Sequence, residues 1–217
     1  MAEGLKLDRF AIDRDSRRLL AVDAIVAPGE VLSVMGPSGT GKSTLLAAIL
    51  GALPRGFVAT GSVVLDGRDL DGLPPEHRRI GLLYQDPLLF PHLDVAGNLA
   101  YGLPPGGGRA HRRAVVEDAL ARIGLAGFEP RDPATLSGGQ AARVALARTL
   151  LARSRALLLD EPFSKLDAVL RDDMRDLVRS EVRARAIPAI LVTHDEADAA
   201  TMGGPVIRLG GRPGEAG

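Results

Sequence analysis

The stretch Gly36–Thr44 reads GPSGTGKST, and two features set it apart from the rest of the chain. Three glycines are spread over its first six residues, and a lysine followed by two hydroxyl residues closes it. The lysine is unusual because only three of the 27 basic residues are lysines, namely Lys6, Lys42 and Lys165. A chain that places almost all of its positive charge on arginine therefore keeps a lysine at this point.

The stretch has the pattern G-x-x-x-x-G-K-[ST] and lies between a predicted buried strand, Glu30–Met35, and a predicted helix, Lys42–Leu50, closed by Gly51. Glycines allow consecutive backbone N–H groups to point inward around phosphate oxygens, and the helix start adds the positive end of its dipole. The compact ammonium of Lys42 can reach the β- and γ-phosphates, where the planar fork of arginine would fit poorly. The hydroxyl of Ser43 can ligate Mg²⁺.

We therefore expect a nucleoside triphosphate to bind at this loop. The alternative is a glycine turn ahead of a core helix, which leaves the full match to the motif unexplained. The expected ATP-binding residues are Gly36, Pro37, Ser38, Gly39, Thr40, Gly41, Lys42, Ser43 and Thr44.

Length and composition limit the remaining possibilities. At 217 residues the chain fits one domain, and its formal net charge of zero gives no overall attraction to nucleic acid or to an anionic membrane. The absence of cysteine excludes disulfides and thiolate metal sites and suits a cytoplasmic protein. The N-terminal segment has no apolar core and no run reaches about 18 apolar residues, so we expect neither a signal peptide nor a membrane span.

Short apolar runs alternate with helical patterns along most of the chain, which predicts an α/β fold with a mainly parallel sheet. From residue 86 to residue 155, proline, glycine and histidine interrupt the sequence and a helical pattern follows, so we expect a helical subdomain inserted into a single domain over residues 1–217. Residues 210–217 are too polar and too rich in glycine to pack, and we expect a flexible tail there. The other predicted strands are Gly61–Gly67 and Arg79–Tyr84, and two core strands, Ala156–Glu161 and Pro188–Asp195.

The run ALLLDE, Ala156–Glu161, supplies a second part of the predicted site. Its leucines predict a strand buried on both faces, and this strand brings Asp160 and Glu161 to the carboxyl edge of the sheet, where α/β proteins bind ligands. Asp160 would hold Mg²⁺, and Glu161 would polarise the attacking water as the catalytic residue. An acid after an apolar run is also an ordinary strand end, so the prediction depends on the phosphate loop.

The run LSGGQ, Leu136–Gln140, precedes a predicted helix and offers a second set of backbone N–H groups for an anion. With this run, nearly the whole chain resembles the ATP-binding cassette family, whose signature it is. The resemblance implies a P-loop NTPase core, an N-terminal antiparallel β subdomain and an inserted helical subdomain. It also implies a head-to-tail pair of cassettes in which the signature contacts ATP in trans through Ser137, Gly138, Gly139 and Gln140. Locally, Ser137 is also a suitable helix N-cap.

The resemblance assigns three further residues. Gln85 matches the glutamine that reports Mg²⁺ and water to the helical subdomain. His194 matches the switch histidine near the γ-phosphate, which we count as catalytic, and Asp167 matches the loop that crosses the dimer interface. Each residue type is common, so the assignment depends on their order and on their places at strand ends.

The segment Leu82–Leu103 resembles cassettes of bacterial binding-protein-dependent importers of the thiamine, iron, molybdate and polyamine kind, and of a small uncharacterised enterobacterial-type branch. There it forms a cleft for a helix of the membrane subunit, so we expect Leu88, Leu89, Phe90, Pro91 and Leu93 to form an exposed apolar patch for a permease. Local core packing is the alternative. The resemblance further implies an indirect solute-binding-protein partner, no nucleic acid, and a location on the inner face of the cell membrane.

Two other function classes share the phosphate loop. A cassette of DNA maintenance would carry long coiled coils, yet about 100 residues separate Gly36 from Leu136, and a translation cassette would be tandem. A small-molecule kinase would leave the LSGGQ run and the Gln85 and His194 pattern unexplained. The sequence therefore favours the importer ATPase, and it does not identify the solute.

One position departs from the family. Cassettes place an aromatic residue early in the first hairpin, where it stacks on adenine, but here the alignment offers Ile12, Asp13 or Arg14. Phe10 is expected to pack into the sheet on the same face as Ile12. The guanidinium of Arg14 could lie over the base instead. We therefore expect weak discrimination between ATP and GTP.

Overall fold

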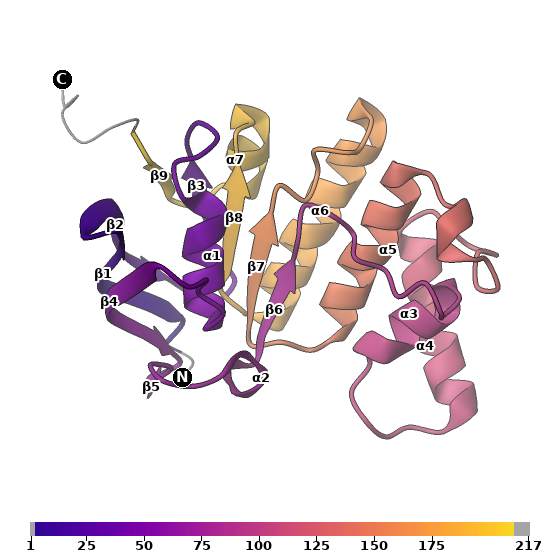
Figure 1. Ribbon diagram of the computed structural model, residues 1–217. Coiled ribbons are helices and arrows are strands. Elements are labelled where there is room, and N and C mark those ends of the chain that lie inside the picture. The colour runs from indigo at the N-terminus through magenta and orange to yellow at the C-terminus, as the bar shows by residue number, and fades with distance from the viewer. Residues whose placement is uncertain (1–2, 211–217) are drawn as a thin grey trace.

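The computed structural model describes residues 3–210, and its strands form two sheets (Figure 1). The parallel sheet has the order β6-β7-β8-β3-β9, and the antiparallel sheet has the order β2-β1-β4-β5. The strands are β1 (Leu5–Arg14), β2 (Arg17–Val26), β3 (Val31–Met35), β4 (Phe57–Leu65), β5 (Arg68–Asp69), β6 (Ile80–Leu83), β7 (Ala156–Asp160), β8 (Ala189–Thr193) and β9 (Val206–Arg208).

The helices fall into two groups along the chain. Those of the sheet region are α1 (Lys42–Leu50), α2 (Pro75–Arg78), α6 (Ala168–Arg185) and α7 (Glu196–Met202). Those between β6 and β7 are α3 (Val95–Gly102), α4 (Arg109–Arg122), the 3₁₀ helix η1 (Pro133–Thr135) and α5 (Gly138–Leu151).

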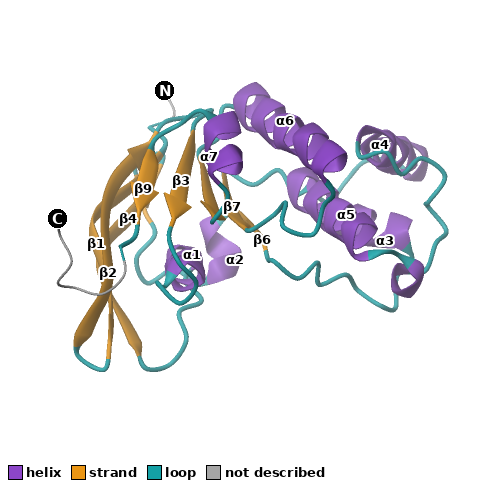
Figure 2. Ribbon diagram, turned by 90° about the horizontal axis from the view of Figure 1, so that it is seen from above, coloured by secondary structure: helices purple, strands orange, loops and turns teal. Residues whose placement is uncertain are grey.

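The parallel sheet is covered on both faces, which explains why its strands are continuous apolar runs. Every residue of β3 and of β8 is buried. Along β7 the side chains alternate: Leu157 and Leu159 belong to a core cluster with α5 and α6, whereas Ala156 and Leu158 belong to a second cluster with α1 and the antiparallel sheet. Figure 2 shows α1 on one side of this sheet and α6 and α7 on the other.

Helices and loops alone connect β6 to β7, and this part lies away from the antiparallel sheet (Figure 1). Two backbone hydrogen bonds join α3 to the loop ahead of η1, from the N–H of Val95 to the carbonyl of Arg131 (3.0 Å) and from the N–H of Ala96 to the carbonyl of Glu129 (2.9 Å). The architecture therefore has the three parts expected from the sequence: a parallel core, an antiparallel sheet and a helical insertion.

The bounds 86–155 for the inserted subdomain, and a single domain over 1–217, remain our proposals. Of the expected tail 210–217, all but Gly210 lies outside the described residues. Within residues 3–210, no helix combines the length and apolar character needed to cross a membrane.

Candidate nucleotide-binding and catalytic site

The phosphate loop joins the end of β3 to the start of α1, as its sequence pattern requires. Gly41 is the N-cap of α1 with φ 89°, and a Cβ at this position would lie 2.8 Å from Cδ2 of Leu19, so both backbone and space favour glycine. The Lys42 side chain is buried, and its Nζ donates hydrogen bonds to the carbonyls of Gly36 (2.7 Å) and Pro37 (2.8 Å). The ammonium therefore lies inside the loop, where phosphate oxygens would be held.

Asp160 ends β7 next to the first turn of α1. Burial raises the pKa of the Asp160 carboxyl, and the neighbouring charge of Glu161 adds to this rise, while a hydrogen bond with Ser43 and the charge of Lys42 oppose it. A hydroxyl and one carboxylate fit Mg²⁺, which prefers oxygen ligands and is usually bound through one or two carboxylates together with substrate phosphates. The structure thus brings together Ser43 and Asp160, two of the three predicted metal ligands.

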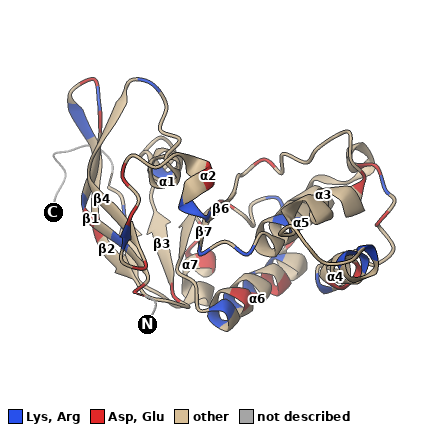
Figure 3. Ribbon diagram, turned by 90° about the horizontal axis from the view of Figure 1, so that it is seen from below, with Lys and Arg blue, Asp and Glu red and all other residues tan. Residues whose placement is uncertain are grey.

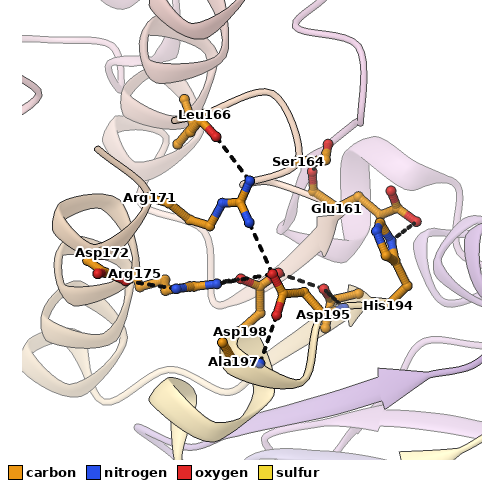
Figure 4. Close-up of polar contacts among 11 residues, drawn as sticks. Glu161, Ser164, Leu166, Arg171, Asp172, Arg175, His194, Asp195, Ala197 and Asp198 are labelled. Atoms are coloured by element: carbon orange, nitrogen blue, oxygen red, sulfur yellow. Dashed lines mark hydrogen bonds and ion pairs between the residues drawn. The ribbon is translucent and has the colours of Figure 1, made fainter. Parts of the chain in front are cut away.

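Glu161 is the centre of a polar group at the carboxyl edge of the sheet. Its backbone has φ 46°, an uncommon conformation for a residue other than glycine. Its carboxylate accepts a hydrogen bond from Nε2 of Gln85 (3.4 Å) and lies 3.2 Å from Nδ1 of His194 (Figure 4). The Glu161 side chain is 17% exposed and that of His194 is 66% exposed, so this group opens to solvent on the histidine side. Gln85, Glu161 and His194 are therefore neighbours.

The signature residues form a helix cap. Ser137 is the N-cap of α5: its Oγ accepts from the N–H of Gln140 (3.3 Å), and Oε1 of Gln140 accepts from the N–H of Ser137 (2.9 Å). Ser137 and Gly138 are exposed, and Gly139 is half-buried. This capping box accounts for a serine at position 137 within the single chain. Because Ser137 and Gly138 are exposed, another molecule can still reach them.

The loop of Asp167 lies beside this cap. Asp167 is itself the N-cap of α6 and accepts a hydrogen bond from the N–H of Leu170 (3.0 Å). A Cβ on Gly139 would lie 3.4 Å from the carbonyl of Lys165, so the loop and the signature are in contact within one chain. The structure thus places Asp167 and Ser137 on neighbouring segments.

A cavity of about 320 Å³ opens over the phosphate loop. It is lined by Ser38, Gly39, Gly41, Lys42, Ser43, Thr44, Gln85, Asp160 and Glu161, and also by Arg14, Leu19 and Phe57. No residue of the signature lines it, among the residues that the structure describes. Of the residues predicted to bind nucleotide or metal, or to act in catalysis, within one chain, all but Gly36, Pro37, Thr40 and His194 therefore line this cavity.

The sequence reading missed Phe57 at this cavity. Phe57 begins β4, opposite Arg14 of β1, and the Arg14 guanidinium lies over its ring, 5.3 Å from the centroid. Phe10 is buried with 3% exposure in the sheet cluster, so the prediction that it packs there is confirmed. The register of β1 with β4, which a single sequence does not give, is the signal that would have found Phe57.

The expected patch from Leu88 to Leu93 is only partly exposed. Leu88 is 57% exposed and Pro91 is exposed, but Leu89, Phe90 and Leu93 are half-buried, so the expectation of one exposed patch was wrong for these three side chains. The reason is that Leu89 packs on the core cluster and Phe90 stacks edge-on against Tyr101, with ring centroids 4.6 Å apart.

Comparison with known proteins supports the class of protein that this geometry defines. A family model described as ABC transporter matches residues 19–164, and the chain belongs to that family. It is an ATPase of the ATP-binding cassette fold, as the sequence predicted.

Individual relatives agree with this. The chain is 53% identical over 184 residues to the uncharacterized ABC transporter ATP-binding protein YnjD of Escherichia coli, covering 85% of each chain. It is 43% identical over 206 residues to the thiamine import ATP-binding protein ThiQ of a Ruegeria species, covering 94% of this chain and 87% of that one. The dimeric post-hydrolysis structure of the ATP-binding cassette MJ0796 bound to ADP and Pi has a TM-score of 0.80 at 28% identity, covering 94% and 93% of the two chains. The similarity gives no support to a DNA-maintenance or translation ATPase.

Proposed function

We propose that this chain is the ATP-hydrolysing subunit of an importer for a small solute, and that it works as a head-to-tail dimer on the inner face of the cell membrane. The observation that carries the proposal is the position of Gln85, which contacts Glu161 and directly precedes the loop of Leu88 and Leu93. A partner bound on that loop would lie a few residues from the catalytic carboxylate. The similarity to import ATP-binding proteins supports the same direction of transport.

In this mechanism the phosphate loop, Gly36–Thr44, binds the triphosphate, and Lys42 places its ammonium against the β- and γ-phosphates. Ser43, Gln85 and Asp160 would hold Mg²⁺, which when bound neutralises charge on the phosphates. The Glu161 carboxylate orients the attacking water and accepts its proton. His194, at 3.2 Å from that carboxylate, would donate a hydrogen bond toward the γ-phosphate.

The second subunit would complete the site. Ser137, Gly138, Gly139 and Gln140 would contact the nucleotide held by the opposite phosphate loop, and Asp167 would lie at the interface between the two sites. The exposure of Ser137 and Gly138 at the start of α5 supports this role, because a helix N-terminus favours a bound anion. Closure of the pair would then push on the permease through the Leu88–Leu93 region.

Copurification with a membrane permease tests this function. The full chain, tagged and expressed in its own host, should be recovered from solubilised membranes with a membrane-spanning protein, and the Leu88→Asp variant should lose that protein while still binding ATP. Recovery with nucleic acid or ribosomes, or with no membrane protein at all, would contradict the importer assignment.

A further inference from the structure

The loop Ser164–Asp167, which we name the interface loop, contacts the catalytic group as well as the signature. The Ser164 hydroxyl donates to the carbonyl of Glu161 (2.9 Å), and Nζ of Lys165 lies 2.7 Å from Oδ1 of Asp86, the neighbour of Gln85. The interface loop is therefore joined to the segments of two of the three residues around the proposed water site. The third residue, His194, lies on a different segment.

One arginine joins the interface loop to the segment of His194. Arg171, in the first turns of α6, donates from Nη2 to the carbonyl of Leu166 (3.0 Å) and from Nη1 to Oδ2 of Asp195 (3.1 Å), as Figure 4 shows. Its side chain is 30% exposed, so these bonds are partly shielded from water. A guanidinium is planar and rigid, and it can hold two acceptors at a fixed separation. Arg171 therefore fixes the distance between Leu166 and Asp195.

Asp195 is in turn firmly held. Its Oδ1 accepts from the N–H of Ala197 (2.8 Å) as the N-cap of α7, and its own N–H donates to Oγ1 of Thr193 (3.0 Å). Burial opposes ionisation of Asp195, but the Ala197 N–H and the nearby Arg175 and Arg171 guanidinium groups outweigh it and lower the pKa of this carboxyl. The carboxylate is thus charged at neutral pH and bonded in a defined orientation.

The neighbours of Asp195 complete a buried network. Thr193 Oγ1 donates to Oδ2 of Asp198 (2.6 Å), and Asp198 is paired with Arg175, which is 5% exposed. Arg171 and Arg175 both belong to α6, along which Figure 3 shows basic and acidic residues. His194 therefore stands between two anchored residues, Thr193 and Asp195, and its ring is mostly exposed. Its backbone position depends on those anchors.

We propose that Arg171 is a positioning residue for ATP hydrolysis: it transmits movements of the interface loop to His194, and so sets the distance between His194 and Glu161. The signature contacts the interface loop, so a subunit arriving at the signature would press on Lys165 and Leu166. Arg171 carries that displacement to Asp195. This inference rests on the proposed roles of Glu161 and His194.

Three variants of the full chain test it by steady-state ATP hydrolysis. In Arg171→Gln, kcat should fall about tenfold while KM for ATP changes less than about twofold, because binding groups are untouched and only orientation is lost. Arg171→Lys should not restore kcat, since one ammonium cannot hold both acceptors in the geometry of the planar fork. Arg179→Gln is the matched control on the same helix: Arg179 pairs with the exposed Asp176 and makes only a long hydrogen bond (3.4 Å) to the carbonyl of Thr201 in α7, away from His194, and the variant should behave as the parent.

A double variant separates positioning from general damage. Asp195→Asn keeps an oxygen that can cap α7 but loses the ion pair with Arg171 (3.1 Å) and the longer one with Arg175 (3.4 Å). The kcat of the double variant Arg171→Gln with Asp195→Asn should lie within about twofold of the kcat of Arg171→Gln alone. The reason is that both substitutions break the same ion pair between Arg171 and Asp195. Full activity of Arg171→Lys, additive losses in the double variant, or a loss that only follows the folded fraction by circular dichroism would each overturn the proposal.

A measurement that does not depend on turnover tests the Arg171 link even if the proposed catalytic roles of Glu161 and His194 are wrong. The ring resonances of His194, identified among the four histidines by their loss in His194→Ala, should shift in Arg171→Gln and stay unchanged in Arg179→Gln. If Glu161→Gln and His194→Ala both keep the parent's turnover, the proposed catalytic roles are wrong, and these resonances then decide whether the Arg171 link exists. Unchanged His194 resonances in Arg171→Gln would overturn it.

Discussion

Asp160 must be charged to hold a cation, yet it lies where a charge is poorly solvated. Burial raises the pKa of its carboxyl. A carboxyl whose folded-state pKa is raised costs stability when it ionises, so this cost is present above the folded pKa and is relieved as the pH falls through it. At neutral pH the ionised Asp160 carboxylate therefore lowers the stability of the nucleotide-free protein.

Removing the buried charge of Asp160 should therefore stabilise the nucleotide-free protein. Asp160→Asn should raise the thermal midpoint of the nucleotide-free protein at pH 7 and should abolish the further rise that MgATP gives to the parent. Asp173→Asn, at an exposed position of α6, is the control and should change neither quantity. Differential scanning calorimetry measures both, and a lower midpoint for nucleotide-free Asp160→Asn would contradict this assignment of the buried charge.

The second prediction concerns the base. Phe57 and Arg14 lie at the cavity and offer a flat ring and a guanidinium, which can stack on either purine. Phe57→Ala should weaken ATP and GTP alike by about 1 kcal/mol, roughly fivefold. Val58→Ala, the exposed neighbour on β4, should change neither affinity. Competition binding measures this, and a parent preference for ATP well beyond about tenfold would show that a base-reading contact exists elsewhere.

At the scale of elements, the loop ahead of α3 is held by one buried amide. Asn98 is fully buried; its Oδ1 accepts from the N–H of Phe90 (2.8 Å), and its Nδ2 donates to the carbonyls of Phe90 (3.1 Å) and Leu93 (3.1 Å). Arg148 of α5 adds a hydrogen bond to the carbonyl of Leu88 (3.0 Å). The proposed permease-docking loop is therefore fixed before any partner binds.

The third prediction tests that fixation. Asn98→Ala leaves buried backbone groups without partners, so it should reduce the free energy of unfolding by about 2 kcal/mol. It should also weaken permease capture while ATP binding stays within about twofold, because the phosphate loop is on another part of the fold. Urea unfolding followed by circular dichroism gives the first quantity, since the chain has no tryptophan. A change below about 0.5 kcal/mol would mean that the loop does not depend on Asn98.

The sequence predicted the elements whose signals are local. The helix Lys42–Leu50 is observed with those bounds because a left-handed glycine stands at each end, Gly41 and Gly51. The strands of the parallel sheet were visible because burial on both faces makes them continuous apolar runs.

What could not be predicted depends on contacts between distant segments. Phe57 reaches the cavity only through the register of β1 and β4, and Asn98 is a common polar residue until its burial is known. The link from Arg171 to Asp195 joins residues 24 apart along the chain, and charged residues at such spacing are usually solvated. Leu89 was expected to be exposed because its apolar neighbours suggested one continuous surface patch, whereas its side chain packs on the core cluster.

At the scale of the whole molecule, the head-to-tail arrangement has a consequence for mixed variants. Lys42→Ala should lose ATP binding, and Ser137→Ala should bind ATP but fail to hydrolyse it. The reason is that Lys42 binds the nucleotide of its own subunit, whereas Ser137 contacts the nucleotide held by the other subunit. An equimolar mixture forms one intact composite site in each mixed dimer, so phosphate release should recover to roughly a quarter of the parent rate. Equal loss of ATP binding in both single variants, or no recovery on mixing, would contradict the arrangement.

The most direct test of the central claim is the mass of Glu161→Gln in the presence of MgATP. This variant keeps every binding residue and removes the carboxylate that activates water, so the closed pair should accumulate. Size-exclusion chromatography with light scattering should show a mass close to twice the 22.8 kDa of the chain with MgATP, and a single chain without nucleotide. Adding Ser137→Ala to the same chain should restore the single-chain mass. If Glu161→Gln stays at the single-chain mass at saturating MgATP, or hydrolyses ATP at the parent rate, this chain does not work as a head-to-tail ATPase pair.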